Sequence, residues 1–472
     1  MEASTPATHA PSDGLWSALK EAVRGSHRDF TTGSIPRSIL LLAVPMALEL
    51  VMESVFAVVD VFVVSRLGPD AVATVGLTEA MLVLVYAVAM GVSIGAMALI
   101  ARRVGEKDTE RAAGTAVQAI LLGVLLALPV AIAGISFARP LLGLMGGSGW
   151  VLQHGVRYMQ VMMGSTLSIT LLFLVNAIFR GAGDAAVAMR VLWLANGINC
   201  VLAPCLVLGL GPFPRLGVVG AAVATTIGRT SGVAYQFWRL SRPGGRIHLR
   251  RRHLHVEWNT ILQVLRLSAS ATVQMLVGMA SWVVMVRIIS SFGSAALAGY
   301  TVAMRIVAFS LLPSWGVSNA AATLVGQNLG AKKPERAERS VWIAAACNSG
   351  FLLVVGLLLL AFAPFLIHLF STDAAVAGFG IGCLRTVSLG FAFYGVGMVM
   401  TQALNGAGDT WTPTLINFGC FWALELPLAW GLAHTLRVGP RGAFLALTVA
   451  FCSLAIVSGL VFRTGRWKLR HL

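Results

Sequence analysis

Apolar stretches of about twenty residues recur along the whole chain, and short polar turns separate them. A stretch of that length crosses a bilayer as an α-helix, whereas a transmembrane barrel shows much shorter alternating segments. The pattern therefore predicts an all-α polytopic membrane protein with twelve transmembrane helices. The expected spans lie at about 39–65, 72–100, 113–137, 156–179, 187–209, 217–238, 268–291, 295–325, 341–363, 378–403, 411–434 and 442–462.

Short sequence motifs of the first half of the chain occur again in the second half. Matching residues are always separated by the same number of positions, for example Gly91 and Gly316, and we call this separation the repeat offset. Each repeat holds six spans, which is an even number, so both halves have the same orientation in the membrane. We therefore expect two six-helix lobes related by a pseudo-twofold axis along the membrane normal. The other pairs at the same separation are Leu67-Gly68 with Phe292-Gly293, Arg102–Arg111 with Gln327–Arg336, and Arg180–Asp184 with Asn405–Asp409.

The polar segments divide this plan into five parts. A polar N-terminal tail (1–34), with a short amphipathic piece at Leu15–Val23, precedes the N-lobe (35–240). A basic linker (241–266) leads to the C-lobe (267–462), and a basic tail (463–472) follows it.

Composition and charge agree with a membrane location. The 472 residues are 57% hydrophobic and 11% charged, with a formal net charge of +16. A charge of that size raises the question of nucleic-acid binding, but Lys and Arg lie between the apolar runs, as the positive-inside rule expects. With the N-terminus inside, 25 of the 35 Lys and Arg fall in inner segments and five in outer turns. We therefore predict a multi-pass protein of the plasma membrane (the cell inner membrane), with both termini cytoplasmic and no nucleic-acid partner.

The first span carries three carboxylates, Glu49, Glu53 and Asp60, although it is otherwise apolar. At 100° per residue they lie within about 40° of one another, and a rise of ~1.5 Å per residue places the first and last about 16 Å apart. Acids at membrane depth usually face a protein interior or a wet cavity, and a carboxylate there can bind and release a proton. The stripe therefore predicts a proton or cation coupling site.

Two further acids, Glu79 and Glu425, lie inside spans and are secondary candidates for the same role. At the repeat offset, Met285 corresponds to Asp60 and Met304 corresponds to Glu79. The second repeat thus lacks these acids, and the asymmetry favours a site in the N-lobe.

Other interpretations stay open beside this one. The plain alternative for the acids is an ion pair with a buried arginine such as Arg229. Pro45 and Pro204 fall inside spans, where the missing backbone hydrogen bond produces ordinary curvature or a bend that changes access to a cavity. The repeated Gly-x-Gly-Asp sequence, ending at Asp184 and Asp409, also occurs in intramembrane aspartyl proteases. Its place at inner helix ends in both repeats favours a glycine turn with an Asp cap.

No phosphate-binding GxxxxGK[ST] loop occurs in the chain. We therefore expect no ATPase partner, no cofactor and no enzymatic activity.

The ordered set of motifs resembles the multidrug and toxic compound extrusion (MATE) family over essentially Ile35 to Phe462. The likeness rests on the two repeats of six spans, on Pro45 fifteen residues before Asp60, on the paired turns and on the stretch Leu216–Thr225. Members are cation-coupled antiporters that export amphipathic, often cationic, organic compounds by switching between inward-open and outward-open states. The resemblance implies the same activity here, with a transported proton, or less favoured sodium, and with small organic molecules and the lipid bilayer as partners.

The family's functional residues carry over only in part. Its first-span Asp falls on Asp60. In one branch the fifth span reads Asn-x-x-Leu-Asp-Pro, and the same stretch here reads Asn199-Cys-Val-Leu-Ala203-Pro204. The Asn is kept, but alanine stands at the acidic position. The acids that a sodium-type branch places in spans 7 and 10 have no counterpart in this chain, which favours proton coupling.

These departures lead to a specific expectation. Glu53 or Glu49 should compensate for the acid missing from the fifth span, while Asn199 and Thr225 supply hydrogen bonds to the coupling carboxylate. The nearest alternative function is a lipid-linked precursor flippase of the wider superfamily. Such proteins tend to have a strongly cationic central cavity, and the acids of the N-lobe disfavour anionic cargo.

Overall fold

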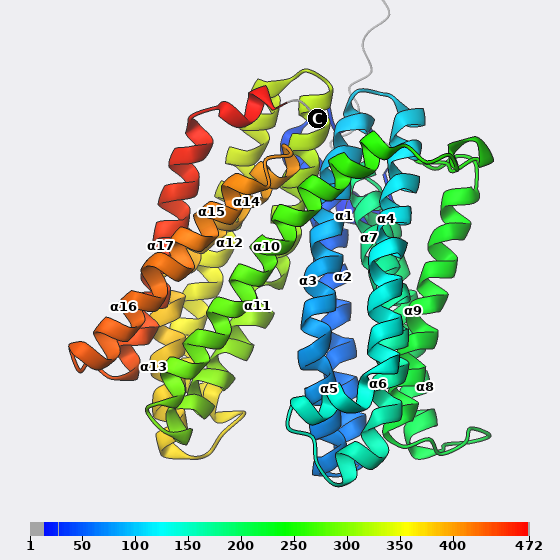
Figure 1. The fold of residues 1–472 in the computed structure, drawn as a ribbon. Coiled ribbons are helices and arrows are strands. Elements are labelled where there is room, and N and C mark those ends of the chain that lie inside the picture. The colour runs from blue at the N-terminus through cyan, green and yellow to red at the C-terminus, as the bar shows by residue number, and fades with distance from the viewer. Residues whose placement is uncertain (1–13, 27, 471–472) are drawn as a thin grey trace, which may run out of the picture.

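The computed structural model describes residues 14–26 and 28–470, and most of them are helical. Two bundles of long helices lean together at the end that carries the C-terminus and diverge toward the other end (Figure 1). The N-lobe consists of α2 (Ile35–Ser65), α3 (Pro69–Gly105), α4 (Thr109–Ser136), α5 (Ala138–Leu144), α6 (Val156–Gly164), α7 (Thr166–Ala182), α8 (Ala185–Leu208) and α9 (Val218–Ser241). The C-lobe consists of α10 (Trp258–Ser290), α11 (Ser294–Gly330), α12 (Pro334–His368), α13 (Ala374–Ser388), α14 (Phe391–Gly406), α15 (Trp411–Asn417), α16 (Leu426–Trp430) and α17 (Pro440–Arg463).

The helices confirm the predicted membrane spans. In the described part of the chain, ten helical stretches are long and apolar enough to cross a bilayer, and the bent pair α13 and α14 makes an eleventh. The remaining predicted span, the sixth in chain order, is α9, a helix of 24 residues that is less apolar because polar residues such as Arg229 and Gln236 interrupt it.

Two boundaries differ from the prediction. The tenth span, expected as one helix, is broken at Leu389 and Gly390, and its two halves meet at 57°. Glycine has a low helix propensity, and hydropathy alone does not register such a break. The seventh span begins at Trp258 rather than near 268, so part of the expected linker is helical.

Contacts between the lobes reproduce the repeat offset. A Cβ added at Gly91 of α3 would lie 2.7 Å from the backbone nitrogen of Thr272 in α10. A Cβ added at Gly316 of α11 would lie 2.8 Å from the backbone nitrogen of Ala47 in α2. Gly91 and Gly316 are one offset apart, and so are Ala47 and Thr272, so one close packing of backbones occurs twice, as a pseudo-twofold axis requires. We call these two contacts the glycine seam.

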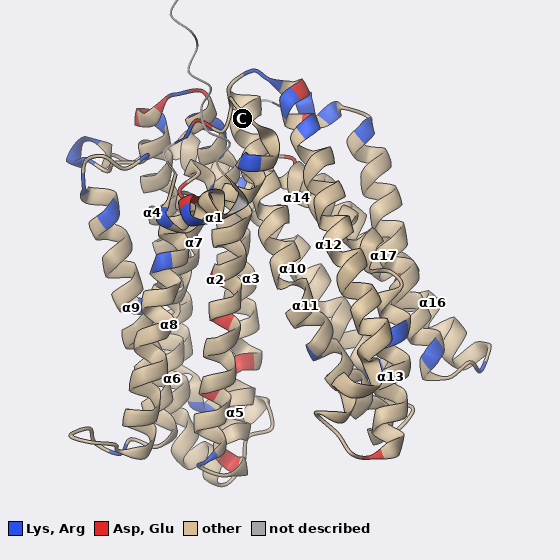
Figure 2. Cartoon of the chain, turned by 180° about the vertical axis from the view of Figure 1, so that it is seen from behind, with Lys and Arg blue, Asp and Glu red and all other residues tan. Residues whose placement is uncertain are grey.

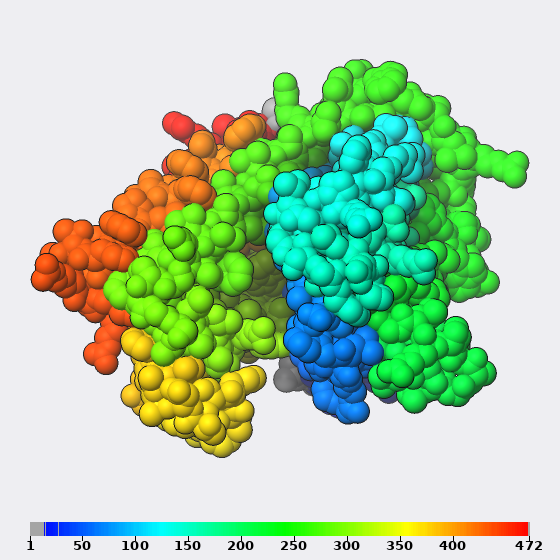
Figure 3. Space-filling view, turned by 60° about the horizontal axis from the view of Figure 1, so that its bottom comes forward, coloured from blue at the N-terminus to red at the C-terminus, as the bar shows by residue number. Residues whose placement is uncertain are grey.

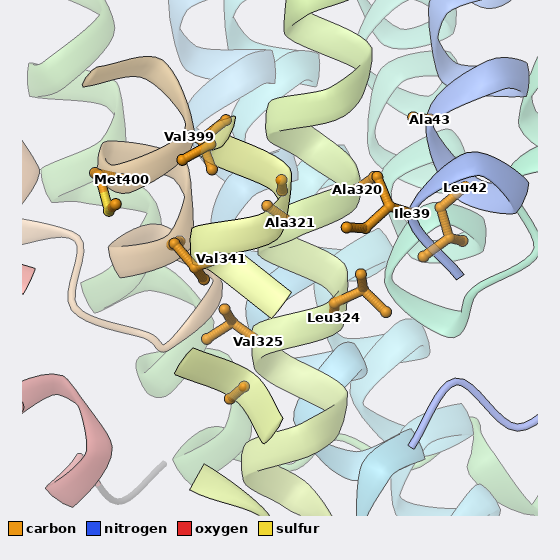
Figure 4. Packing of buried hydrophobic residues seen from close by; sticks show 14 of the residues in the cluster. Ile39, Leu42, Ala43, Ala320, Ala321, Leu324, Val325, Val341, Val399 and Met400 are labelled. Atoms are coloured by element: carbon orange, nitrogen blue, oxygen red, sulfur yellow. The ribbon is translucent and has the colours of Figure 1, made fainter. Parts of the chain in front are cut away.

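Buried hydrophobic side chains extend the same symmetric interface. Figure 4 shows Ile39 and Leu42 of α2 packed toward Ala320 and Leu324 of α11. The corresponding cluster on the other side of the axis joins the end of α3 to α10, where Leu99 and Ile100 meet Val264 and Leu267. Each lobe therefore contributes its first two spans to the contact with the other lobe.

The N-terminal tail bridges both lobes at their closed end. Helix α1 (Leu15–Arg24) confirms the predicted amphipathic piece, with Ala18 and Ala22 buried and Trp16 exposed. The following segment 28–33, which we call the strap, offers its backbone carbonyls to basic side chains on two sides. Those hydrogen bonds are Arg246 to Arg28 O (2.5 Å), Lys333 to Thr31 O (2.9 Å), and Arg336 to Thr32 O (2.8 Å) and Gly33 O (3.0 Å).

At the opposite end the molecule is hollowed. Figure 3 shows a recess between the N-lobe and the C-lobe on the face turned away from the C-terminus. Figure 2 shows that many Lys and Arg residues, together with some acids, gather at the closed end, and that a further group of acids lies farther along the N-lobe helices.

Candidate functional site

Each of the three acids of α2 has different surroundings. Glu49 and Asp60 are buried, at 2% and 7% exposure, whereas 28% of the Glu53 side chain is accessible. The helical stripe predicted from the sequence therefore becomes three distinct sites, which we describe in order from the closed end.

Glu49 forms a buried ion pair. Its Oε1 accepts hydrogen bonds from Arg180 Nη1 at 2.7 Å and from Asn176 Nδ2 at 3.1 Å. The Asn176 Oδ1 in turn accepts from Gln236 Nε2 at 2.8 Å. This network joins α2, α7 and α9, and removing one member of such a buried pair leaves an uncompensated charge.

Glu53 lies one helical turn farther from the closed end and has two partners. Its Oε2 accepts a hydrogen bond from Asn196 Nδ2 of α8 at 2.8 Å, and its Oε1 lies 3.8 Å from Arg229 Nη2 of α9. The same Arg229 nitrogen donates to the Tyr86 hydroxyl at 2.9 Å. Arg229, the residue that the sequence suggested as an ion-pair partner of the acids, thus lies beside Glu53.

Asp60 has the least satisfied carboxylate of the three. Its Oδ1 is buried and, among the described residues, has no hydrogen-bond partner. Asn199 Nδ2 donates instead to Thr225 Oγ1 at 2.8 Å. These two side chains are thus hydrogen-bonded to each other, and neither is hydrogen-bonded to Asp60. This corrects the expectation that both donate to the coupling carboxylate. Glu79 of α3 is exposed, and its charge acts on Asp60.

A cavity of about 100 Å³ lies between the lobes, next to the acids nearest the closed end. Both lobes contribute to its wall, and the lining combines carboxylates, amides, thioethers and aromatic rings. The residues that carry this character are Glu49, Glu53, Met90, Met97, Phe173, Arg180, Met275, Trp315, Asn319 and Gln402.

The C-lobe contains no copy of the acidic stripe. Met285, which corresponds to Asp60, is buried among hydrophobic side chains, and Met304, which corresponds to Glu79, is half-buried. Glu425 is buried at 3% exposure at the end of a π-helical segment, Phe418–Glu425. Among the described residues no hydrogen bond or ion pair to its carboxylate is formed.

The repeated glycine turns have a structural role. Gly183 and Gly408 adopt φ values of +85° and +84°, a conformation that favours glycine. Asp409 accepts a hydrogen bond from the Thr412 hydroxyl at 2.6 Å and from Arg470 at 3.1 Å. Asp184 stands at the N-terminus of α8 but makes no capping hydrogen bond, so the expected Asp cap is wrong for the first repeat.

The two prolines singled out in the sequence lie inside continuous helices. Pro45 is buried within α2, and Pro204 lies within α8 next to Ala203, which is fully buried. That either proline is a point of bending stays a prediction.

Several partners of the acids were not predicted from the sequence. Asn176 and Arg180 of α7 and Asn196 of α8 bind Glu49 or Glu53, and Tyr86 of α3 binds Arg229, but none of the four was connected to the stripe on α2. The available signal was the occurrence of amide and basic side chains inside apolar spans, where such groups need partners.

Comparisons with known proteins place this geometry in a family. The MatE family model matches residues 45–205 and again 270–430, so the second match begins and ends one repeat offset after the first. The chain is 26% identical over 444 residues to the probable multidrug resistance protein YoeA of Bacillus subtilis (strain 168), with 93% of this chain and 96% of that protein covered.

Solved structures agree with the sequence relatives. A MATE family transporter of the MOP superfamily in an outward-facing conformation matches with a TM-score of 0.86 and 25% identity, over 92% of this chain and 96% of that chain. A MATE protein in a bent conformation matches with the same score and identity, over 94% and 97%. The family model covers more than half of the sequence in two matched copies, and the chain therefore belongs to the MATE family of multidrug extrusion transporters.

Proposed function

We propose that this protein is a proton-coupled antiporter that exports amphipathic, often cationic, organic compounds across the plasma membrane by alternating access. The observation that carries the proposal is the N-lobe acid stripe. There the partly accessible Glu53 borders the cavity between the lobes, and the buried Asp60 has an oxygen without a partner among the described residues.

The lining of the cavity supports a substrate of this class. The Glu53 carboxylate lies in the wall beside Phe173 and Trp315, and the faces of such aromatic rings attract organic cations. Met90 and Met275 are flexible and polarisable, which allows one site to accommodate molecules of different shape.

The distribution of charge supports an orientation. The basic side chains of the closed end belong on the cytoplasmic side by the positive-inside rule, which puts both tails inside. The recess between the lobes then opens outward (Figure 3). A solved relative in an outward-facing conformation is consistent with this assignment.

The cycle we propose uses Asp60 as the exchanging acid. From the outward-open state Asp60 takes up an external proton, the site loses negative charge, and its affinity for a cationic amphipath falls, so the substrate leaves outward. Bending of α2 near Pro45 and rocking of the lobes then open the site inward, where the proton is released and a new substrate binds. Net transport requires the substrate to bind the protonated and deprotonated states differently.

The test is transport into everted vesicles under separately imposed proton and sodium gradients. We expect Asp60→Asn to abolish substrate accumulation driven by the pH gradient, whereas Asp70→Asn, an exposed acid in the first turn of α3, leaves it unchanged. Undiminished proton-driven accumulation by Asp60→Asn would refute the coupling role. Accumulation driven by sodium alone would reassign the ion.

The flippase alternative is less well supported. Arg180, a cation in the cavity wall, is already paired with Glu49, so the wall offers little for a phosphate to bind. A growth assay with organic cations in an efflux-deficient host distinguishes the two functions, because a flippase confers no resistance.

A further inference from the structure

Arg229 is the most deeply enclosed basic residue of the described chain. Of the Lys and Arg side chains in residues 14–26 and 28–470, it alone falls in the buried class, at 4% exposure. A guanidinium keeps its charge at any physiological pH, and a buried charge needs a nearby counter-charge. A carboxylate close to Arg229 must therefore carry a negative charge whenever the N-lobe is packed in this way.

The contacts of Arg229 identify that carboxylate. Its Nη2 lies 3.8 Å from Glu53 Oε1 and donates to the Tyr86 hydroxyl at 2.9 Å. Its carbon Cζ lies 5.6 Å from the centre of the Tyr86 ring and 6.0 Å from that of Phe56, distances typical of cation–π contact. The other terminal nitrogen, Nη1, is buried without a partner among the described residues.

The remaining ionisable groups around this pair come from every neighbouring helix. Asp60 of α2, Glu79 of α3 and Tyr158 of α6 all lie within electrostatic range of Arg229, and Cys200 of α8 lies within range of Asp60. The next pair along α2, Glu49 with Arg180, is already neutral overall. Within the described chain, one arginine thus faces three acids that have no other cation beside them.

The hydrogen bonds distinguish Glu53 from Asp60. Glu53 has an amide donor from Asn196 on one oxygen and Arg229 beside the other, so both oxygens of its carboxylate have a partner. Asp60 has an oxygen that no donor of the described residues reaches. We infer that Arg229 is a built-in counter-cation for Glu53, a positioning residue that keeps Glu53 negatively charged and reserves Asp60 for the exchanged proton.

This inference rests on the proposed antiport and changes one part of the sequence-based expectation. Glu53 does not replace the acid missing at Ala203 by exchanging a second proton. It forms a fixed, neutral pair with Arg229, and one proton per cycle moves on the stripe.

A double-mutant cycle tests the pair without requiring transport. We compare the thermal unfolding midpoints of detergent-purified wild type, Arg229→Gln, Glu53→Gln and the double variant, with Arg287→Gln, an exposed arginine of α10, as control. Each single variant should lower the midpoint by about 5 °C or more because it leaves one charge uncompensated, and the double variant should recover most of that loss. Additive losses in the double variant would overturn the pairing.

Transport assays test the second half of the inference, which is that Asp60 and not Glu53 exchanges the proton. In proteoliposomes the double variant, which lacks an acid of the cavity wall, should transport substrate more weakly, but the number of protons moved per substrate should equal the wild-type number. Arg229→Gln alone should show a changed pH profile. If the double variant loses proton coupling while Asp60 is intact, Glu53 exchanges a proton and the assignment is wrong. If wild type itself shows no coupled transport, the antiport proposal fails, while the unfolding cycle still decides whether Arg229 and Glu53 form the pair.

Discussion

The two lobes have equivalent backbone conformations but differ in the charged side chains that they bury. The close backbone contacts of Gly91 and Gly316 are equivalent under the repeat offset, and so are the left-handed conformations of Lys107 (φ +60°) and Lys332 (φ +57°). The buried charges, by contrast, are not equivalent under the repeat offset. The N-lobe pairs Glu49 and Glu53 with arginines, whereas the C-lobe has methionines where the N-lobe has Asp60 and Glu79.

The comparison shows that packing and function place different demands on a duplicated chain. The interface between the lobes needs two matching surfaces, so substitutions there in one half affect the fit to the other. The coupling site that we propose is needed only once per cycle, so the second lobe can hold apolar side chains where the first holds acids.

The largest expected effect comes from breaking a charge pair that the C-lobe lacks. Arg180→Ala leaves Glu49 buried without its cation and should reduce the free energy of unfolding by about 3–5 kcal/mol. The equivalent C-lobe residue is Asn405, whose side chain donates to Gln402 Oε1 at 2.6 Å, and Asn405→Ala should cost about 1 kcal/mol. Denaturant unfolding of both purified variants measures the difference, and equal losses would contradict the asymmetry of the lobes.

The glycine seam tests the symmetric part of the comparison. Gly91→Ala and Gly316→Ala each force a methyl group against the backbone of the other lobe, and each should destabilise the protein by about 1–3 kcal/mol. Gly278→Ala in α10, where no atom lies within 4 Å of the added carbon, serves as control and should be neutral or slightly stabilising. Unfolding curves that differ strongly between the two seam variants would contradict the equivalence of the two contacts.

The smallest effect is expected from the solitary acid of the C-lobe. Glu425→Gln removes no hydrogen bond or ion pair that the described residues form, and a neutral amide is easier to bury than an unpaired charge. The unfolding midpoint should stay the same or rise slightly, and proton-driven export should continue. Loss of coupling in vesicles carrying this variant would place part of the proton site in the C-lobe.

Much of the fold was predictable because its signals are local. Apolar runs identified the spans, and the constant offset identified the duplication, which the paired matches of the MatE model confirm. The break between α13 and α14 was missed because a single Leu389-Gly390 step barely changes the hydropathy of the span.

The candidate site was predictable only as a set of residue types. The stripe of Glu49, Glu53 and Asp60 follows from helical periodicity, but the partners of these acids depend on how distant helices pack. Arg180 is 131 positions away from Glu49, and nothing in the local sequence connects them. The mutual hydrogen bond of Asn199 and Thr225 is a similar case, since either side chain had several possible acceptors.

The strap at residues 28–33 has a consequence for the timing of the proposed transport cycle. Arg246, from the connection between the lobes, and Lys333 and Arg336, from the C-lobe, all bind its backbone carbonyls. The lobes cannot part at this end without separating the strap from one set of these donors. In the proposed cycle, the strength of that attachment should therefore set how long each molecule stays outward-open before it returns to the inward-open state. Because the acceptors are main-chain carbonyls, side-chain substitutions within the strap should leave this dwell time largely unchanged.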